Sequence, residues 1–254
     1  MKIRHLLTTL AGLCLTLQVF ATLKPIAKPN LTFVEVDGLV AAEAEHFVKQ
    51  ELTDVRAWHI ISTVNAPDIE PDADPSTAAD ASGGAYLEIL PDNRRTHDEK
   101  LIRGENFSPD PGKMAILTYR VYFSTPGRYY FWGRIFSTGP EDNGMHIGIN
   151  GSWPESGQRW QTVKKRAWQW DCKQRTEAIH VGVPMQLYID VETVGSQTIQ
   201  ISMREDGFQL DKWVMSRDIN FVPTGMGPKS VSRNVEPPAP FPATVQPNAD
   251  GFAI

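Results

Sequence analysis

The chain has 254 residues, of which 41% are hydrophobic, and it carries 25 basic against 30 acidic side chains. This length is sufficient for one all-β domain of about 200 residues around a single hydrophobic core. The acidic balance argues against general nucleic-acid binding, because phosphate backbones are bound by basic surfaces.

The first 21 residues have the pattern of a signal peptide and predict a secreted protein, extracellular or periplasmic. Lys2 and Arg4 form a basic head, an apolar run covers residues 6–20, and Ala21 ends a small-residue cleavage site. The alternative is a membrane anchor, but the apolar run is short for a bilayer span. Cleavage removes Lys2 and Arg4, which leaves 23 basic against 30 acidic residues and a net charge of −7. No stable membrane insertion is expected after cleavage.

The N-terminal part of the domain is predicted to begin with two strands, at 32–36 and 39–47. Asp37-Gly38 separates them, and this dipeptide is typical of a tight hairpin turn. Further along the chain, the pattern predicts short strands at 58–62 and 85–90 and long polar loops at 66–84 and 91–113.

The strongest hairpin pattern lies in the middle of the chain. Alternating apolar residues from Ala115 to Phe123 predict a strand, and Ser124-Thr125-Pro126-Gly127 suits a type II turn. The following stretch, 128–137, contains YYFWGRIF and is apolar on both faces. Such a pattern is typical of a central strand in a sandwich.

The C-terminal part of the domain is predicted to end in a second hairpin. Residues 198–203 alternate in polarity, Glu205-Asp206-Gly207 supplies turn chemistry, and 208–215 is a second apolar run. The alternation breaks at Lys212, which predicts a β-bulge or an exit from the core. We expect this closing strand to pair with 39–47. Between the two hairpins, strands are expected at 145–150 and 185–191, and the segment 151–182 has few strand signals.

These elements together predict an all-β jelly-roll β-sandwich. About ten short strands are separated by turn signals, and no stretch has the pattern of an amphipathic helix of normal length. The sandwich is expected over residues 31–222. The Pro-rich residues 223–254 predict a flexible tail or linker.

Three stretches resemble the galactose-binding-like jelly rolls of non-catalytic carbohydrate-binding modules, namely LVAAEAEHF at 39–47, ASGGAYLEI at 81–89 and MREDGFQLDKWVM at 203–215. The chain is similar to modules related to families 6 and 35, and to the β-sandwich at the C-terminus of family 115 glycoside hydrolases. HIGINGSWPESGQRWQ and WQWDCKQR also resemble an insert in modules of polysaccharide-degrading bacteria. The resemblance implies sugar binding without turnover, with a separate polysaccharide-degrading enzyme or domain as partner.

No catalytic motif is evident, so we do not expect an enzyme. The six His residues do not form a HExxH zinc motif, Ser156-Gly157 lacks the upstream glycine of a nucleophile elbow, and nucleotide-binding glycine loops are missing. Cys172, the only cysteine after signal cleavage, has the character of a buried structural thiol. A glycosidase carboxylate pair stays open because it is defined by distance in space. A polysaccharide lyase is the first alternative, since 158–175 could supply a base and a charge neutraliser.

Glu43, Glu45 and Asp211 are candidate ligands of a structural calcium ion. The two glutamates are two residues apart, so their carboxylates lie on one side of a strand that is expected to pair with the strand of Asp211. Calcium takes six to eight oxygen ligands, mainly from carboxylates and carbonyls. The resemblance also implies a calcium between these segments. The alternative is that the glutamates face solvent and Asp211 pairs with Lys212 or Arg217.

Aromatic residues mark the candidate carbohydrate-binding surface, because sugars stack their C–H faces on rings. Four tryptophans fall in the poorly patterned segment after Asn150, and two further aromatics lie at strand edges, giving the set Trp153, Trp160, Trp168, Trp170, Trp58 and Tyr86. The alternative for some of them is a small accessory core that folds the segment onto the sheet.

The same segment is basic, which predicts an anionic polysaccharide as ligand. From 158 to 175 it carries Arg166 and five other Lys or Arg residues against Asp171 alone, in a chain that is acidic as a whole. Arginine forks bind carboxylate and sulfate oxygens in bidentate fashion. Nucleic acid would satisfy the same features, but export and overall acidity argue against it.

Three classes of function therefore remain, in this order. A secreted non-catalytic carbohydrate-binding protein is favoured, with a uronate-containing or sulfated polysaccharide as its ligand. A β-sandwich polysaccharide lyase or glycoside hydrolase comes second. A surface adhesion or structural protein comes third.

Overall fold

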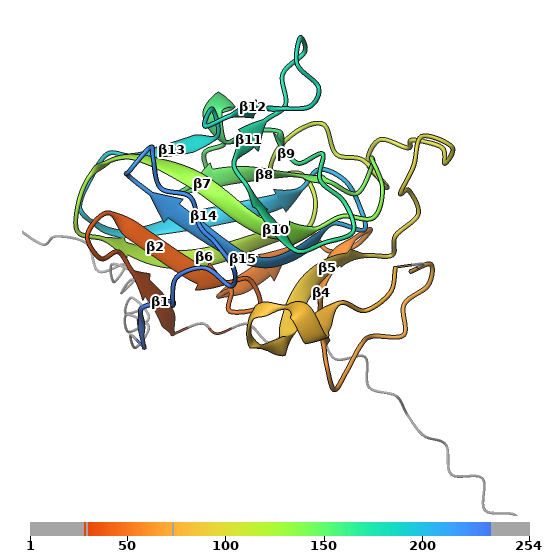
Figure 1. Ribbon diagram of the computed structural model, residues 1–254, viewed down its shortest axis with the longest axis horizontal. Helices are drawn as coiled ribbons and strands as arrows, with labels where there is room; N and C mark the ends of the chain where they lie inside the picture. The colour runs from red at the N-terminus through yellow and green to blue at the C-terminus, as the bar shows by residue number, and fades with distance from the viewer. Residues whose placement is uncertain (1–27, 29, 73, 235–254) are drawn as a thin grey trace, which may run out of the picture.

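The computed structural model describes residues 28, 30–72 and 74–234 and shows two sheets packed face to face (Figure 1). The nine-stranded sheet consists of β1 (Leu31–Val34), β3 (Lys49–Glu51), β6 (Ile116–Phe123), β8 (Gly144–Ile149), β9 (Trp160–Gln161), β11 (Lys173–Gln174), β12 (Val183–Pro184), β14 (Gly195–Met203) and β16 (Ser232–Asn234). The seven-stranded sheet consists of β2 (Leu39–Glu43), β4 (Ala57–Ser62), β5 (Ala85–Leu90), β7 (Gly127–Phe136), β10 (Gln169–Asp171), β13 (Tyr188–Val191) and β15 (Gln209–Ser216).

The strand order confirms an all-β sandwich of the jelly-roll kind. The nine-stranded sheet runs β12-β11-β9-β8-β14-β6-β1-β16 with β3 also on β6, and the seven-stranded sheet runs β10-β7-β15-β5-β4 with β13 on β7 and β2 on β15. Short 3-10 turns are the only helical segments in the described ranges, at η1 (Ala78–Asp80), η2 (Ser82–Gly84) and η3 (Glu155–Gly157). No helix in these ranges is long and apolar enough to cross a membrane.

The three predicted hairpins are connections between the two sheets. β1, β6 and β14 lie in the nine-stranded sheet, whereas β2, β7 and β15, which follow them directly, lie in the seven-stranded sheet. The turn at Asp37-Gly38 forms as expected, with φ of 52° and 81°. It carries the chain across the core, and one isolated bridge, Val36 to Leu39, is formed between the two strands. Turn chemistry is local, so it does not determine which sheet the next strand joins.

The closing strand β15 pairs with β2 as predicted, but β2 ends at Glu43 and not at residue 47, so Glu45 lies in the turn after the strand. β15 also contains the predicted irregularity. Its register against β7 shifts between Leu210 and Lys212, which is a β-bulge. The bulge places Lys212 and Asp211 beside polar partners, Glu43 and Arg134 respectively. Trp213 points into the core, because the extra residue reverses the alternation after Leu210.

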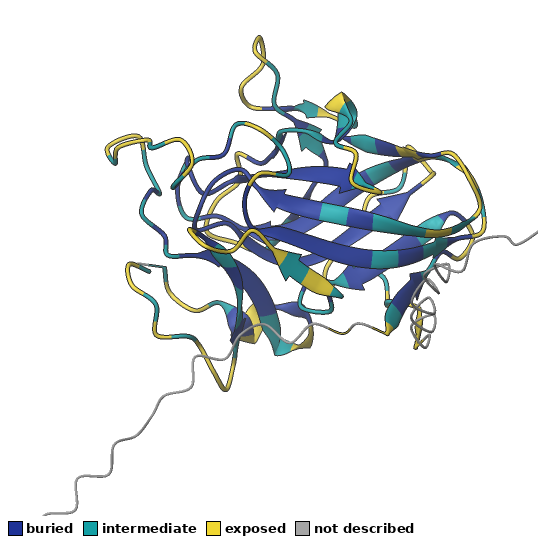
Figure 2. Cartoon of the chain, turned by 180° about the vertical axis from the view of Figure 1, so that it is seen from behind, coloured by how far each residue is buried: buried dark blue, intermediate teal, exposed yellow. Residues whose placement is uncertain are grey.

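The core lies between the sheets around the fully buried ring of Trp213. Its centroid is 6.0 Å from Phe33 and 5.2 Å from Tyr119 in the nine-stranded sheet, and 5.8 Å from Phe131 in the seven-stranded sheet. Figure 2 shows that the strands are mostly buried and that exposed residues gather in the loops. One side chain thus packs against both layers, so the relative position of the sheets depends on it.

The chain remains on the sandwich beyond residue 222, where the flexible tail was expected to begin. The carbonyl of Gly225 accepts hydrogen bonds from Trp170 Nε1 at 3.0 Å and from Arg134 Nε at 3.1 Å. β16 then pairs with β1 at the edge of the nine-stranded sheet. The predicted signal peptide and the rest of the predicted tail, 235–254, lie outside the described residues.

Buried carboxylates lie beneath the loops at one end of the sandwich. Burial, together with the charges of Asp206 and Asp74, raises the pKa of Asp92 to about 8. Burial also raises the pKa of Asp206 and of Asp142 to about 6, and that of Glu88 well above its ordinary value. Nε of Arg95 lies 3.9 Å from Oδ2 of Asp92, but the Arg95 side chain is more than a third exposed. Its charge therefore lowers the pKa of Asp92 by less than the burial of the carboxylate raises it.

We predict that Trp213→Ala lowers the free energy of unfolding by about 3–5 kcal/mol, because it leaves a cavity that both sheets line. Urea denaturation followed by circular dichroism measures the change. Val64→Ala is the control, since Val64 is 92% exposed and its removal should change stability by less than about 0.5 kcal/mol. A small effect for Trp213→Ala would mean that another contact holds the sheets together.

We also predict that Asp92→Asn stabilises the fold at pH 8 and changes it little near pH 4. A carboxyl whose pKa is raised in the folded state destabilises that state increasingly as pH rises from its unfolded pKa to its folded pKa. Asn resembles the protonated acid and keeps an acceptor for the Arg94 amide, 3.2 Å from Asp92 Oδ1. Melting temperatures at pH 4, 6 and 8 measure the effect. Destabilisation at every pH would show that the contact with Arg95 outweighs burial.

Candidate functional site

Loops from four parts of the chain enclose a charged cleft of about 540 Å³ at the end of the sandwich where the loop after β5 projects (Figure 1). The segments that line it follow β5, follow β7, surround β9 to β12, and join β14 to β15. Its ionisable lining consists of Arg94, Lys165, Arg175, Arg204, Glu141, Glu205, His97 and His180. Four arginine or lysine side chains thus face two glutamates.

Both glutamates of the charged cleft are engaged by the protein itself. Glu141 contacts the guanidinium of Arg94 and the imidazole of His97. Glu205 contacts the guanidinium of Arg204, and its Oε2 accepts the backbone N–H of Asn143 at 3.0 Å. Their negative charges are therefore offset locally, and the cleft keeps an excess of positive charge.

Lys165 and Arg175 supply this excess. Neither side chain has a hydrogen bond or ion pair with the rest of the described chain. Partial burial and the nearby charge of Arg204 lower the pKa of the Arg175 guanidinium. A half-buried arginine without an anionic partner is a receptor for carboxylate, sulfate or phosphate oxygens.

Apolar side chains line another part of the cleft, including Leu101, Val163 and Val181, which are 41%, 42% and 58% exposed. The ring of Phe107 lies under Arg204, whose guanidinium carbon is 5.0 Å from the ring centroid. The cleft therefore combines C–H surface with cations. Sequence reasoning missed Phe107 because a single aromatic in a polar loop carries no spacing signal.

Most of the predicted sugar-stacking rings are enclosed by the fold. Trp58 and Trp160 are fully buried and meet Phe208, with ring centroids 6.2 and 5.7 Å away. Tyr86 is 1% exposed and Trp170 is 7% exposed beneath the segment that contains Gly225. These rings present almost no surface to a sugar. Trp58, Trp160 and Trp170 pack in the main core, and Tyr86 belongs to a smaller accessory core.

Three predicted residues keep accessible surface, but they are dispersed. Trp153 is half-buried against Gly112, where an added Cβ would lie 2.3 Å from its Nε1. Trp168 is half-buried against Tyr86, and its Nε1 donates to the carbonyl of Thr77 at 3.1 Å. Arg166 is exposed, next in sequence to Lys165 of the charged cleft.

The three predicted calcium ligands lie near one another but have other partners. Glu43 Oε1 accepts Lys212 Nζ at 2.7 Å, while Asp211 contacts Arg134 and accepts the Ser82 amide at 2.8 Å. Burial, with smaller effects from the charges of Glu43 and Asp211, raises the pKa of Glu45 to about 8. Oε2 of Glu43 and Oε2 of Glu45 are buried without a hydrogen bond. In the described ranges, no group of three or more His, Cys, Asp or Glu side chains is arranged to hold a metal.

Several known proteins are similar to this chain. The uncharacterized protein P23 of Formosa agariphila is 44% identical over 243 residues, which cover 95% of this chain and 59% of P23. The chain thus spans less than two thirds of that relative.

Two solved structures are similar at low identity. A GH26-CBM35 β-(1,4)-mannanase of Podospora anserina matches at 11% identity and a TM-score of 0.41, over 71% of this chain and 28% of that one. A family 35 carbohydrate binding module of Clostridium thermocellum matches at 17% identity and a TM-score of 0.34, over 69% of this chain and 97% of that one.

The family assignment comes from the sequence of nearly the whole sandwich. Residues 32–230 match the model of the glycosyl hydrolase family 115 C-terminal domain. This range begins in β1 and ends just before β16, so it includes every other strand of both sheets. The chain therefore belongs to the glycosyl hydrolase family 115 C-terminal domain family.

Proposed function

We propose that this protein is an exported, non-catalytic carbohydrate-binding protein whose charged cleft binds an anionic polysaccharide. The proposal rests on which charged side chains of the cleft have partners within the protein. Glu141 and Glu205 are engaged by other protein groups, whereas the side chains of Arg175 and Lys165 form no ion pair or hydrogen bond within the described chain, and the two glutamates act on Arg175 only at a distance. A glycan that carries carboxylate or sulfate groups would supply the missing anion, and its C–H faces would meet Phe107 and the apolar rim.

Binding without turnover is supported by the same arrangement. A glycoside hydrolase needs one carboxyl that donates a proton to the leaving oxygen and a second that acts as base or nucleophile. In the charged cleft, both oxygens of Glu141 and both of Glu205 have protein partners. The two histidines of the cleft also have protein partners: His97 contacts Glu141, and His180, which is exposed, contacts the carbonyl of Glu177. A hydrolase or lyase is therefore not favoured, and a separate polysaccharide-degrading enzyme is the expected partner.

We also propose that calcium binds between β2 and β15. The fit rests on the two buried oxygens without hydrogen bonds, Oε2 of Glu43 and Oε2 of Glu45, which are hard acceptors of the kind that calcium takes. Asp211 fits less well because Arg134 already contacts it. A bound ion would stabilise the carboxylates in their charged form and would hold the terminal strands of the sandwich together.

For the cleft, we predict that Arg175→Ala weakens binding of polygalacturonate or carrageenan about 10- to 100-fold, the effect of losing a charge-assisted hydrogen-bond pair. Affinity electrophoresis at low and high salt measures it. Wild-type affinity should fall with added salt as screening increases, and the variant should show a flatter salt dependence. Arg166→Ala should weaken binding less, because Arg166 is exposed and does not line the charged cleft.

The matched control is Arg233→Ala, which removes an exposed arginine that lies over Tyr122, outside the charged cleft. It should leave binding unchanged. Equal losses for Arg175→Ala and Arg233→Ala would indicate a diffuse charge effect and contradict a specific cleft. Release of reducing or unsaturated ends from either polysaccharide would overturn the non-catalytic assignment.

For the metal, we predict that EGTA lowers the melting temperature of the wild-type protein, because a ligand that binds only the native state stabilises it by mass action. Glu45→Gln should abolish this response to EGTA while preserving the shape of the side chain. A wild-type melting curve that EGTA does not shift would exclude the site.

A further inference from the structure

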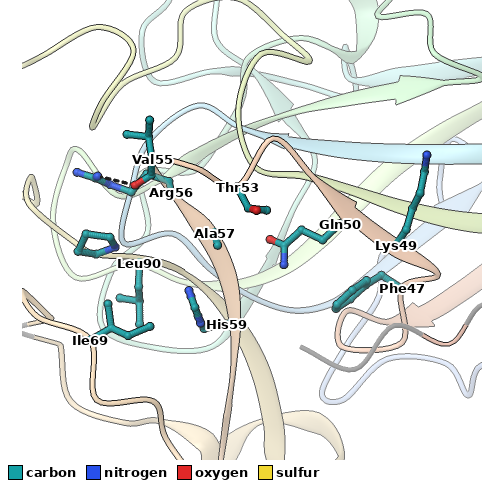
Figure 3. Close-up of a pocket in the computed structure, with 11 residues that line it drawn as sticks. Phe47, Lys49, Gln50, Thr53, Val55, Arg56, Ala57, His59, Ile69 and Leu90 are labelled. Atoms are coloured by element: carbon teal, nitrogen blue, oxygen red, sulfur yellow. Dashed lines mark hydrogen bonds between the residues drawn. The ribbon is translucent and has the colours of Figure 1, made fainter. Parts of the chain in front are cut away.

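A second concavity, the neutral hollow, has a volume of about 600 Å³ and lies where β3 and β4 approach at the sheet edges (Figure 3). Its apolar wall includes Phe47, Val55, Ile69 and Leu90, and its polar groups include Thr53 and His59. A mostly apolar concavity of this size with a few polar groups is typical of sites for small molecules.

The wall of the neutral hollow is held in place by backbone contacts. The side-chain amide of Gln50 pairs with the edge strand as a neighbouring strand would: its oxygen accepts the Trp58 N–H at 2.5 Å and its nitrogen donates to the Trp58 carbonyl at 3.1 Å. The carbonyl of Leu52 accepts the Ala115 N–H at 2.8 Å. The concavity is therefore formed before any ligand arrives, which reduces the entropy lost on binding.

The charges around the neutral hollow are already paired. Arg56 donates from Nε and Nη2 to Asp206 Oδ2, at 3.2 and 3.1 Å. Lys49 forms an ion pair with Glu51, in which Nζ lies 2.8 Å from Oε2. No carboxylate is among the lining residues, and burial lowers the pKa of His59, so its imidazole is uncharged at neutral pH. An anionic ligand would therefore find no unpaired cation here, unlike in the charged cleft.

Two polar groups in the neutral hollow lack partners. Neither ring nitrogen of His59 has a hydrogen bond with the described chain, and because Nδ1 is closed to solvent, Nε2 is the nitrogen that a ligand can reach. The Thr53 hydroxyl, in the loop before β4, has no hydrogen bond with the rest of the described chain. A ligand that carries hydroxyl groups on an otherwise C–H surface would satisfy both, while its apolar face packs on Ile69 and Leu90.

We propose that the neutral hollow binds an uncharged pyranose unit, with its hydroxyls on His59 and Thr53 and its C–H face on the apolar wall. This inference rests on the proposed glycan-binding function, but it concerns a separate site. The neutral hollow and the charged cleft lie on either side of the turn between β14 and β15, because Asp206 holds Arg56 while the preceding Glu205 lines the cleft. Binding in the hollow is independent of salt, since no ion pair is formed.

The test is a titration of the full-length mature protein with the methyl glycosides of glucose, galactose, mannose and xylose, followed by NMR and calorimetry at low and high salt. At least one glycoside should saturate the hollow with the same affinity at both salt concentrations. His59→Phe keeps the ring shape but removes the nitrogens, and it should weaken binding about tenfold, the value of one neutral hydrogen bond. Thr53→Trp fills the hollow from an exposed loop and should abolish binding.

Two controls separate this site from the others. Thr193→Trp places the same bulk at an exposed threonine that lines a different concavity, beside Asn150 and Gln197, and should leave glycoside affinity unchanged. Arg175→Ala should also leave it unchanged while it weakens polygalacturonate binding.

The outcomes distinguish this proposal from the proposed function. If polygalacturonate binds and no neutral glycoside does, the neutral hollow is not a sugar site and the charged cleft stands. If a glycoside binds equally well to wild type, His59→Phe and Thr53→Trp, its site lies elsewhere and the inference is overturned. If glycosides bind as expected and polygalacturonate does not, the hollow is supported and the anionic specificity fails.

Discussion

The ring of Trp213 packs against Phe33, Tyr119 and Phe131, and so contacts both sheets from a single position in β15. The described chain has one cysteine, Cys172, which is free and buried, so no disulfide joins the layers. The sheets are therefore held together by burial of apolar surface, which is non-directional and needs shape complementarity to set one arrangement. The bulge between Leu210 and Lys212 makes this packing possible, because it turns the indole inward.

The same bulge has a consequence for charge. It leaves both Asp211 and Lys212 on the polar side of β15, where Arg134 and Glu43 meet them. Buried ion pairs of this kind contribute little net stability, since desolvation offsets their attraction, but removal of one partner is costly. The polar side of β15 thus depends on a set of matched charges, and the two free oxygens of Glu43 and Glu45 are the part of that set that a cation would complete.

At the loop end of the sandwich, the turn between β14 and β15 separates two different chemical environments. Glu205 lines the charged cleft, whereas Asp206 holds the guanidinium of Arg56 beside the neutral hollow. In the charged cleft the carboxylates are engaged and the Arg175 side chain forms no ion pair within the described residues, whereas in the neutral hollow both lining cations, Lys49 and Arg56, are paired. A glycan that crosses the turn would meet electrostatic attraction in the charged cleft, which added salt weakens, and apolar contact in the neutral hollow, which salt does not screen.

The sequence alone determined the long strands of both sheets, the bulge, the pairing of β2 with β15 and the family of the domain, because alternation, turn dipeptides and motif order can be read along the chain. It did not determine the short strands β3, β9, β10, β11 and β16, which have too few residues to show an alternation. It did not determine the pairing of neighbouring strands: β6 and β7 have inward apolar faces that suit a hairpin and a sandwich equally, and only packing across the core assigns them to different sheets. Tertiary structure also decided the site. Trp160 lies in a tryptophan-rich segment, which is the pattern expected of a sugar-stacking surface, but its side chain is buried in the core. Phe107 and Arg175 line the same cleft only because the fold brings together loops that are distant in sequence. Burial and the proximity of distant loops are set by the whole fold, so residue types and spacing along the chain do not encode them separately.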